Sequence, residues 1–167
     1  MASILKVDTV QGATTATAVD ISSVTNLKLP AGHVIQTVFH SSATVVTYSG
    51  STFQSFGMSK SFTPKFSDSI IWLITTIAGE HYNYSDLGIS YNIKQDSTVL
   101  YDSQYTDYHS SDNSQNISQH TMQWYGSAGS TSARSYSVVF KPSNSNGTAR
   151  VNNYGDPSYM TIMEIAQ

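Results

Sequence analysis

The sequence predicts an all-β protein, an antiparallel β-sandwich with a jelly-roll-like arrangement. About ten short segments carry apolar and aromatic residues at strand spacing, separated by turn-forming residues. No segment has a convincing helical period, and no repeat of fixed length is evident. The longest apolar run, residues 70–78, is rich in Ile and Thr, so we expect a strand buried on both faces. A second sheet or another copy of the chain must then cover each face.

The first 32 residues predict an extended arm rather than a folded unit. Residues 3–11 roughly alternate apolar and polar side chains from Leu5 onward, as a strand does, and Gly12 ends this segment. The arm is too poor in apolar residues to form a core, so we expect it to gain order against neighbouring chains. A leader without fixed structure is the alternative. The residues expected to dock the arm or to join subunits are Ile4, Leu5, Val7, Val10, Val19 and Ile21.

Residues 33–167 predict the folded body. Alternation is strongest over residues 87–93, which place Leu87, Ile89, Tyr91 and Ile93 on one face. Further strands are predicted over residues 33–41, 43–48, 98–101, 117–124, 136–140, 149–154 and 159–165.

Three of the connections in this body are predicted from composition. Residues 53–57 predict a short link that Gly57 closes, and residues 81–85 a polar aromatic loop. Residues 102–115 contain no aliphatic side chain and predict a long polar loop, a type of segment that is often functional.

Composition excludes several function classes. Only 11 % of the 167 residues are charged, the net charge is −3, and there is no Cys. Scattered basic residues form no patch for nucleic acid, and a chain without Cys has no disulfide and no thiolate metal site. Residues 70–78 are too short to span a bilayer as a helix, and the N-terminus has no secretory pattern. We therefore expect neither nucleic-acid binding, nor membrane insertion, nor secretion through a signal peptide.

The residues expected of an enzyme are sparse. Glu80 and Glu164 are the only glutamates, and the aspartates of residues 102–115 are expected to form turns. No nucleophile elbow, phosphate loop or EF-hand pattern occurs. Asp107 and His109 lie two residues apart, but a solvated loop histidine is favoured over a metal ligand. We expect no enzymatic activity, no cofactor and no metal.

Aromatic and amide side chains in the expected loops suggest recognition of a polar surface such as a glycan. Tyr offers a rigid apolar ring with a hydroxyl group, and Asn and Gln offer both donors and acceptors. The alternative is that these tyrosines cover backbone or pack between subunits. The candidate residues are Tyr82, Tyr84, Tyr105, Tyr108, His109 and Arg134.

Several segments also carry a family resemblance. Residues 3–11, SILKVDTVQ, and residues 29–36, LPAGHVIQ, resemble segments of tail-fibre-like structural proteins of marine and cyanobacterial tailed phages. Residues 62–67 and 161–165 look like the same set, whereas residues 82–132 match it least. The resemblance implies a homotrimeric virion protein whose N-terminal arm attaches to other virion proteins.

Three other functions stay open at this point. A capsid decoration or head-fibre protein would belong to the virion without binding a receptor. A stand-alone lectin-like module would bind carbohydrate as a single molecule. A depolymerase is disfavoured, because glutamates are scarce and no β-helix repeat is present.

Overall fold

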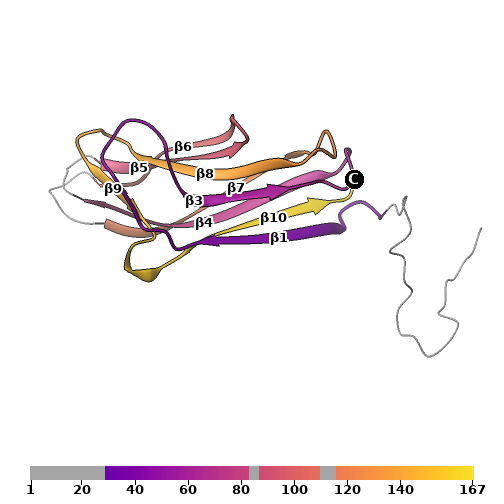
Figure 1. Ribbon diagram of the computed structural model, residues 1–167, viewed down its shortest axis with the longest axis horizontal. Coiled ribbons are helices and arrows are strands. Elements are labelled where there is room, and N and C mark those ends of the chain that lie inside the picture. Colours follow the sequence, from indigo (N-terminus) through magenta and orange to yellow (C-terminus); the bar gives the residue numbers. More distant parts are fainter. Residues whose placement is uncertain (1–28, 83–86, 110–115) are drawn as a thin grey trace, which may run out of the picture.

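The computed structural model describes residues 29–82, 87–109 and 116–167 (Figure 1). Within these ranges the chain forms ten β-strands and one 3-10 turn, with no α-helix, which confirms the all-β prediction. The elements are β1 Val34–Ser42, β2 Val46–Tyr48, β3 Gln54–Phe62, β4 Ile70–Tyr82, β5 Leu87–Gln95, β6 Thr98–His109, β7 Asn116–Ser127, β8 Arg134–Pro142, β9 Thr148–Val151, η1 Asn153–Gly155 and β10 Ser158–Ile165.

The strands form two antiparallel sheets that lie face to face (Figure 1). Sheet A has the order β1-β10-β4-β9-β2, with β7 on the free side of β4, and sheet B has the order β3-β8-β5-β6. Strand β4 organises sheet A: residues 70–76 pair with β10, residues 79–82 pair with β9, and β7 runs along the opposite side of β4. The apolar run identified in the sequence is therefore the central strand of the larger sheet.

The hydrophobic core lies between the two sheets. Ile89, Tyr91 and Ile93 of β5 are fully buried there, as their predicted common face requires, whereas the Leu87 side chain lies outside the described residues. Phe56 and Phe140 meet edge to face with ring centroids 5.7 Å apart. The other large side chains of this core include Met58, Phe62, Ile71, Leu73, Ile77, Tyr136, Val138, Met160 and Ile162.

Two predicted connections are strands in the structure. Residues 98–109 form one strand, β6, so most of the predicted polar loop pairs with β5. This strand lies at the edge of sheet B, where outward side chains face water and need not be apolar. Residues 54–62 form β3, and Gly57 stays within it at a φ of +81°, where the pairing with β8 shifts register.

Strand β4 also extends past its predicted end. Gly79 does not terminate the strand, because it pairs with Ser118 of β7 and with Val151 of β9, and the Tyr91 side chain fills the space that a side chain at position 79 would need. The first two residues of the predicted loop over residues 81–85 therefore belong to β4, and residues 83–85 lie outside the described residues. The predicted strand over residues 149–154 is shorter, since β9 ends at Val151 and η1 follows.

The prediction that residues 70–78 are buried on both faces is only half right in the single chain. Ile71, Leu73 and Ile77 are buried against sheet B, but Trp72 and Ile74 on the other face are only half-buried. No element of the described chain covers that second face, because both sheets use one face each for the shared core.

Candidate functional site

The sandwich has two ends, and the first is where the chain enters the body. Gly32 donates its backbone N–H to the Ala166 carbonyl at 2.9 Å, and the Ala166 N–H returns to His33 at 2.9 Å. The entry into β1 is thereby paired with the C-terminal residues beside it. We call this region, residues 29–33, 63–69 and 166–167, the arm end.

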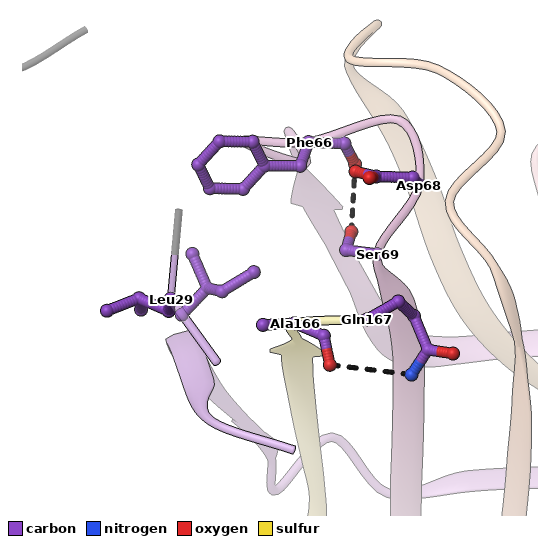
Figure 2. A pocket seen from close by; sticks show the side chains of 7 residues that line it. Leu29, Phe66, Asp68, Ser69, Ala166 and Gln167 are labelled. Carbon is purple, nitrogen blue, oxygen red and sulfur yellow. Dashed lines mark hydrogen bonds between the residues drawn. The ribbon is translucent and has the colours of Figure 1, made fainter. Parts of the chain in front are cut away.

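A recess of about 210 Å³ opens at the arm end (Figure 2). Leu29 borders it from the chain entering β1, and Phe66 and Ser69 border it from the connection between β3 and β4. Ser69 is held there by donating its hydroxyl to the Phe66 carbonyl at 2.8 Å. Ile35, Asp68, Ala166 and Gln167 complete the lining. The mixture of apolar and amide groups suits contact with a peptide segment better than binding of a charged ligand.

A buried carboxylate, Glu164 of β10, fixes this end of the sandwich. Its oxygens accept hydrogen bonds from the backbone N–H of Lys65 at 2.8 Å and of Phe66 at 2.9 Å, and from the Ser69 hydroxyl at 2.7 Å. Gln36 adds a fourth donor at 2.6 Å from β1. One side chain thus ties β1, β10 and the β3–β4 connection together.

The hydrogen bonds also set the ionisation of Glu164. Burial raises the pKa of this carboxyl, but the donors from Lys65, Ser69, Phe66 and Gln36 together outweigh burial and hold the pKa below its usual value. The carboxylate is therefore ionised and satisfied inside the protein, which is the arrangement of a structural anchor rather than of a general acid.

The second end of the sandwich, the distal end, gathers most of the candidate recognition residues. Tyr82 is the last residue of β4, and Tyr105, Tyr108 and His109 lie in the final part of β6. The pairing of Leu87 with His109 and of His81 with Asn116 brings the ends of β4, β5, β6 and β7 together (Figure 1). Tyr84 and the side chains of the other four candidates lie outside the described residues.

Arg134 does not belong to that group. It begins β8 and pairs with Phe62, so it lies towards the arm end, a strand length away from Tyr82. Its guanidinium donates to the Ser130 carbonyl at 3.0 Å and to the Ser130 hydroxyl at 2.8 Å. These bonds hold the preceding loop in place, which is a local structural role.

The other glutamate is engaged as well. Glu80 is 2 % exposed and accepts from Arg150 at 3.4 Å and from the Asn153 amide at 2.5 Å. This ion pair joins β4 to β9 and to η1. Both glutamates therefore have hydrogen-bond partners within the described part of the chain.

The outer face of sheet A is apolar in large part, and the sequence predicts only its central strand, through the apolar run at residues 70–78. Register places Thr37, Met163, Trp72 and Tyr125 in one row across β1, β10, β4 and β7. The next row is Phe39, Thr161, Ile74 and Gln123. Phe39 is 73 % exposed and Tyr125 is 72 % exposed. The apolar members of the face are Val34, Phe39, Ile70, Trp72, Ile74, Tyr125, Tyr159, Met163 and Ile165.

The arm residues Ile4, Leu5, Val7, Val10, Val19 and Ile21 lie outside the described residues, so their role stays a prediction. The same holds for the boundary between arm and body, since the described chain begins at Leu29.

Comparisons with known proteins and a search for metal ligands and spanning helices add four findings. No protein-family model matches the chain. No curated protein matches it either. Among the side chains that are described within residues 29–82, 87–109 and 116–167, no three of His, Cys, Asp or Glu come together as metal ligands would. Those ranges also contain no helix with the length and apolar content to cross a membrane.

Proposed function

We propose that this protein is a non-enzymatic structural component of a phage virion, a tail-fibre-like appendage that assembles as a homotrimer. Its N-terminal arm attaches it to other virion proteins, and its distal end contacts a glycan on the host surface. The proposal takes the resemblance of residues 3–11 and 29–36 to such proteins together with the strand order and the two ends described above.

The strand order is the observation that carries the proposal. Without the short strands β2 and β9, sheet A has the order β1-β10-β4-β7 opposite β3-β8-β5-β6. Strands β3, β4 and β5 alternate between the sheets, and so do β6, β7 and β8, as the crossing connections of a jelly roll do. This order supports a jelly roll, an architecture that recurs in viral capsid and lectin domains.

The separation of the two ends supports a division of labour between attachment and recognition. The chain enters the body beside Glu164, while Tyr82, Tyr108 and His109 lie at the opposite ends of their strands. A particle protein that holds on at one end and touches a cell at the other needs this separation. Aromatic hydroxyl side chains at strand ends suit stacking against sugar rings.

A stand-alone lectin-like module is the second candidate, because the same strand order is found in lectin domains. A capsid decoration protein would share the fold and the arm but lack a receptor. Binding of a single, unassembled molecule to a glycan array would favour the lectin. Antibody labelling of the capsid, with unchanged adsorption after loss of the protein, would favour decoration.

The attachment role is tested by deleting residues 1–28, which leaves every described strand in place. We expect the truncated protein to fold but to be absent from purified particles, while the full chain is incorporated and labelled at the tail. Normal incorporation of the truncated chain would show that the arm does not dock the protein.

The recognition role is tested at the distal end of β6. We expect Tyr105→Ala together with Tyr108→Ala to weaken particle adsorption at least about tenfold, as loss of aromatic contacts does at other interfaces. Tyr101→Ala is the matched control, because this exposed tyrosine lies in the same strand near the arm end. If particles carrying the wild-type protein, the double variant and the Tyr101→Ala control adsorbed equally, the receptor site would lie elsewhere.

A further inference from the structure

We infer that the outer face of sheet A is the surface through which copies of this chain associate, so that a second copy supplies the layer missing over β4. This inference rests on the self-association in the proposed function and names the surface that makes it. It starts from the half-buried side chains of Trp72 and Ile74, which alternate with fully buried Ile71 and Leu73 in the same strand.

The chemistry of the face favours an identical partner. The rows that cross it at Met163–Trp72 and at Thr161–Ile74 contain no charged side chain, so one copy does not repel another. The polar residues among them, such as Thr161 and Gln123, have both donor and acceptor capacity and can pair with themselves. A face without charged side chains lets identical copies pack against one another around a common axis without electrostatic repulsion.

The size of the face is adequate for a stable contact. Four strands spaced by about 4.8 Å, each contributing about nine residues at 3.3 Å, give a projected area of about 570 Å². Because exposed rings such as Phe39 and Tyr125 protrude from the sheet, the accessible area of the face is larger than its projected area. It approaches the roughly 800 Å² that each partner buries in a standard interface. Exposed rings and aliphatic side chains gathered on one face of that size are typical of an interaction surface.

The position of the face also fits the arm. Strand β1 forms one edge of sheet A, and Leu29 precedes it at the arm end. If copies are related by an axis that runs along the strands, every copy presents the start of β1 at the same end. The arms of an assembly built through this face therefore start together, as common docking to a particle requires.

A sugar is the other ligand that exposed rings suggest. Trp72, Gln123, Trp124 and Tyr125 border a depression where β4 and β7 meet. Met163 and Ile74 are the register neighbours of Trp72 and Gln123 on the outer face, and they offer no hydrogen bonds to hydroxyl groups, which favours a protein surface over a glycan.

The first test measures the mass of the full chain by sedimentation over a wide range of concentrations. We expect the wild-type chain to be an oligomer, and Phe39→Asp and Tyr125→Asp each to raise the dissociation constant at least about 30-fold. Both side chains are largely exposed, so the single molecule should fold unchanged. Val99→Asp is the matched control, an exposed apolar residue of β6 in sheet B, and should leave the mass unchanged.

The outcomes separate the two proposals. A wild-type chain that stays a single molecule at all concentrations overturns both the self-association and this surface, and glycan binding by that molecule through Trp72 would assign the face to a sugar. An oligomer whose mass survives both substitutions overturns only the surface.

The second test measures the rate of thiol labelling, so it does not need a substitution that weakens the assembly. The chain has no cysteine, so a single introduced thiol reports on its own surroundings. We expect Thr161→Cys to react with a maleimide at least about tenfold more slowly in the oligomer than after dilution, because access controls thiol reactivity. Ser137→Cys, in β8 of sheet B, should react at the same rate in both. If association slowed the labelling of both thiols equally, or slowed the labelling of neither, the inference would be contradicted.

Discussion

The two outer faces of the sandwich differ in chemistry although both belong to antiparallel sheets of the same core. A row across sheet A places Met163 beside Trp72 and Tyr125. A row across sheet B places Val139 between Ser55 and Asn92, with Asp102 beyond. An antiparallel sheet that faces water normally carries mostly polar outward residues, and the row across sheet B, in which Val139 is the one apolar member, follows that pattern. The row across sheet A does not follow it, because three of its four outward residues are Met163, Trp72 and Tyr125.

Strand β10 shows the difference within one element. Its charged residue, Glu164, points inward and is fully buried, whereas Tyr159 on the outward side is 54 % exposed. At these two positions the usual placement of charged and apolar residues is inverted, although Met160 and Ile162 of the same strand face the core. A buried carboxylate is tolerated because four donors satisfy it, and exposed rings are tolerated where a partner covers them.

The largest expected effect separates the two faces of β4. Leu73→Ala should lower the free energy of unfolding by about 3 kcal/mol, because it leaves a cavity in the core. Ile74→Ala, on the half-buried outer face, should lower it by less than about 1 kcal/mol in the single molecule. Chemical denaturation in a Phe39→Asp background, where we expect no association, measures both. Equal losses would mean that both faces of β4 are already buried within one chain.

The sequence predicted β4, β5 and the all-β class because alternation and length of apolar runs are recorded directly in residue order. It did not predict β6 beyond Tyr101, because a polar edge strand has no apolar alternation to distinguish it from a loop. The sequence also predicts an end at Gly57 and the end of the apolar run at Ala78, because the pairing partners that continue both strands lie far along the chain.

Some features of the candidate site can also be predicted from residue order, and others cannot. The apolar run at residues 70–78 signalled that β4 needs a layer on each side, but residue order does not say which face sheet B covers. The anchoring role of Glu164 was missed, although a lone carboxylate between Met163 and Ile165 in an apolar strand is a signal that it has buried partners. Arg134 was grouped with loop tyrosines because its end of the sandwich depends on strand direction.

The next largest effect concerns the carboxylate on the inner side of β10. Glu164→Gln should lower the free energy of unfolding at pH 7 by about 2–3 kcal/mol, because an amide cannot accept from all four donors. The pKa of Glu164 lies below its usual value in the folded state, so the carboxylate stabilises the fold above about pH 4.5. This stabilisation is lost as the pH falls through the lower pKa of the folded protein.

Denaturation between pH 7 and pH 3 therefore distinguishes an anchor from a surface charge. The difference in stability between the wild type and Glu164→Gln should narrow as the pH falls. Asp68→Asn is the control, since this exposed carboxylate lies in the same β3–β4 connection. A constant difference at every pH would show that the ionised form of Glu164 is not what holds the arm end.

The smallest expected effect sharpens the comparison from the side of sheet B. Ser137 faces outward from β8 between Ser59 and Lys94, so Ser137→Glu places a carboxylate beside an ammonium group. We expect the free energy of unfolding to change by less than about 0.5 kcal/mol and the mass of the assembly to stay the same. Thr161→Glu, at the equivalent outward position between Phe39 and Ile74, places a charge on the surface through which we propose that copies associate, and should disperse the oligomer. If the sheet B variant dispersed the assembly and the sheet A variant did not, the two faces would exchange roles.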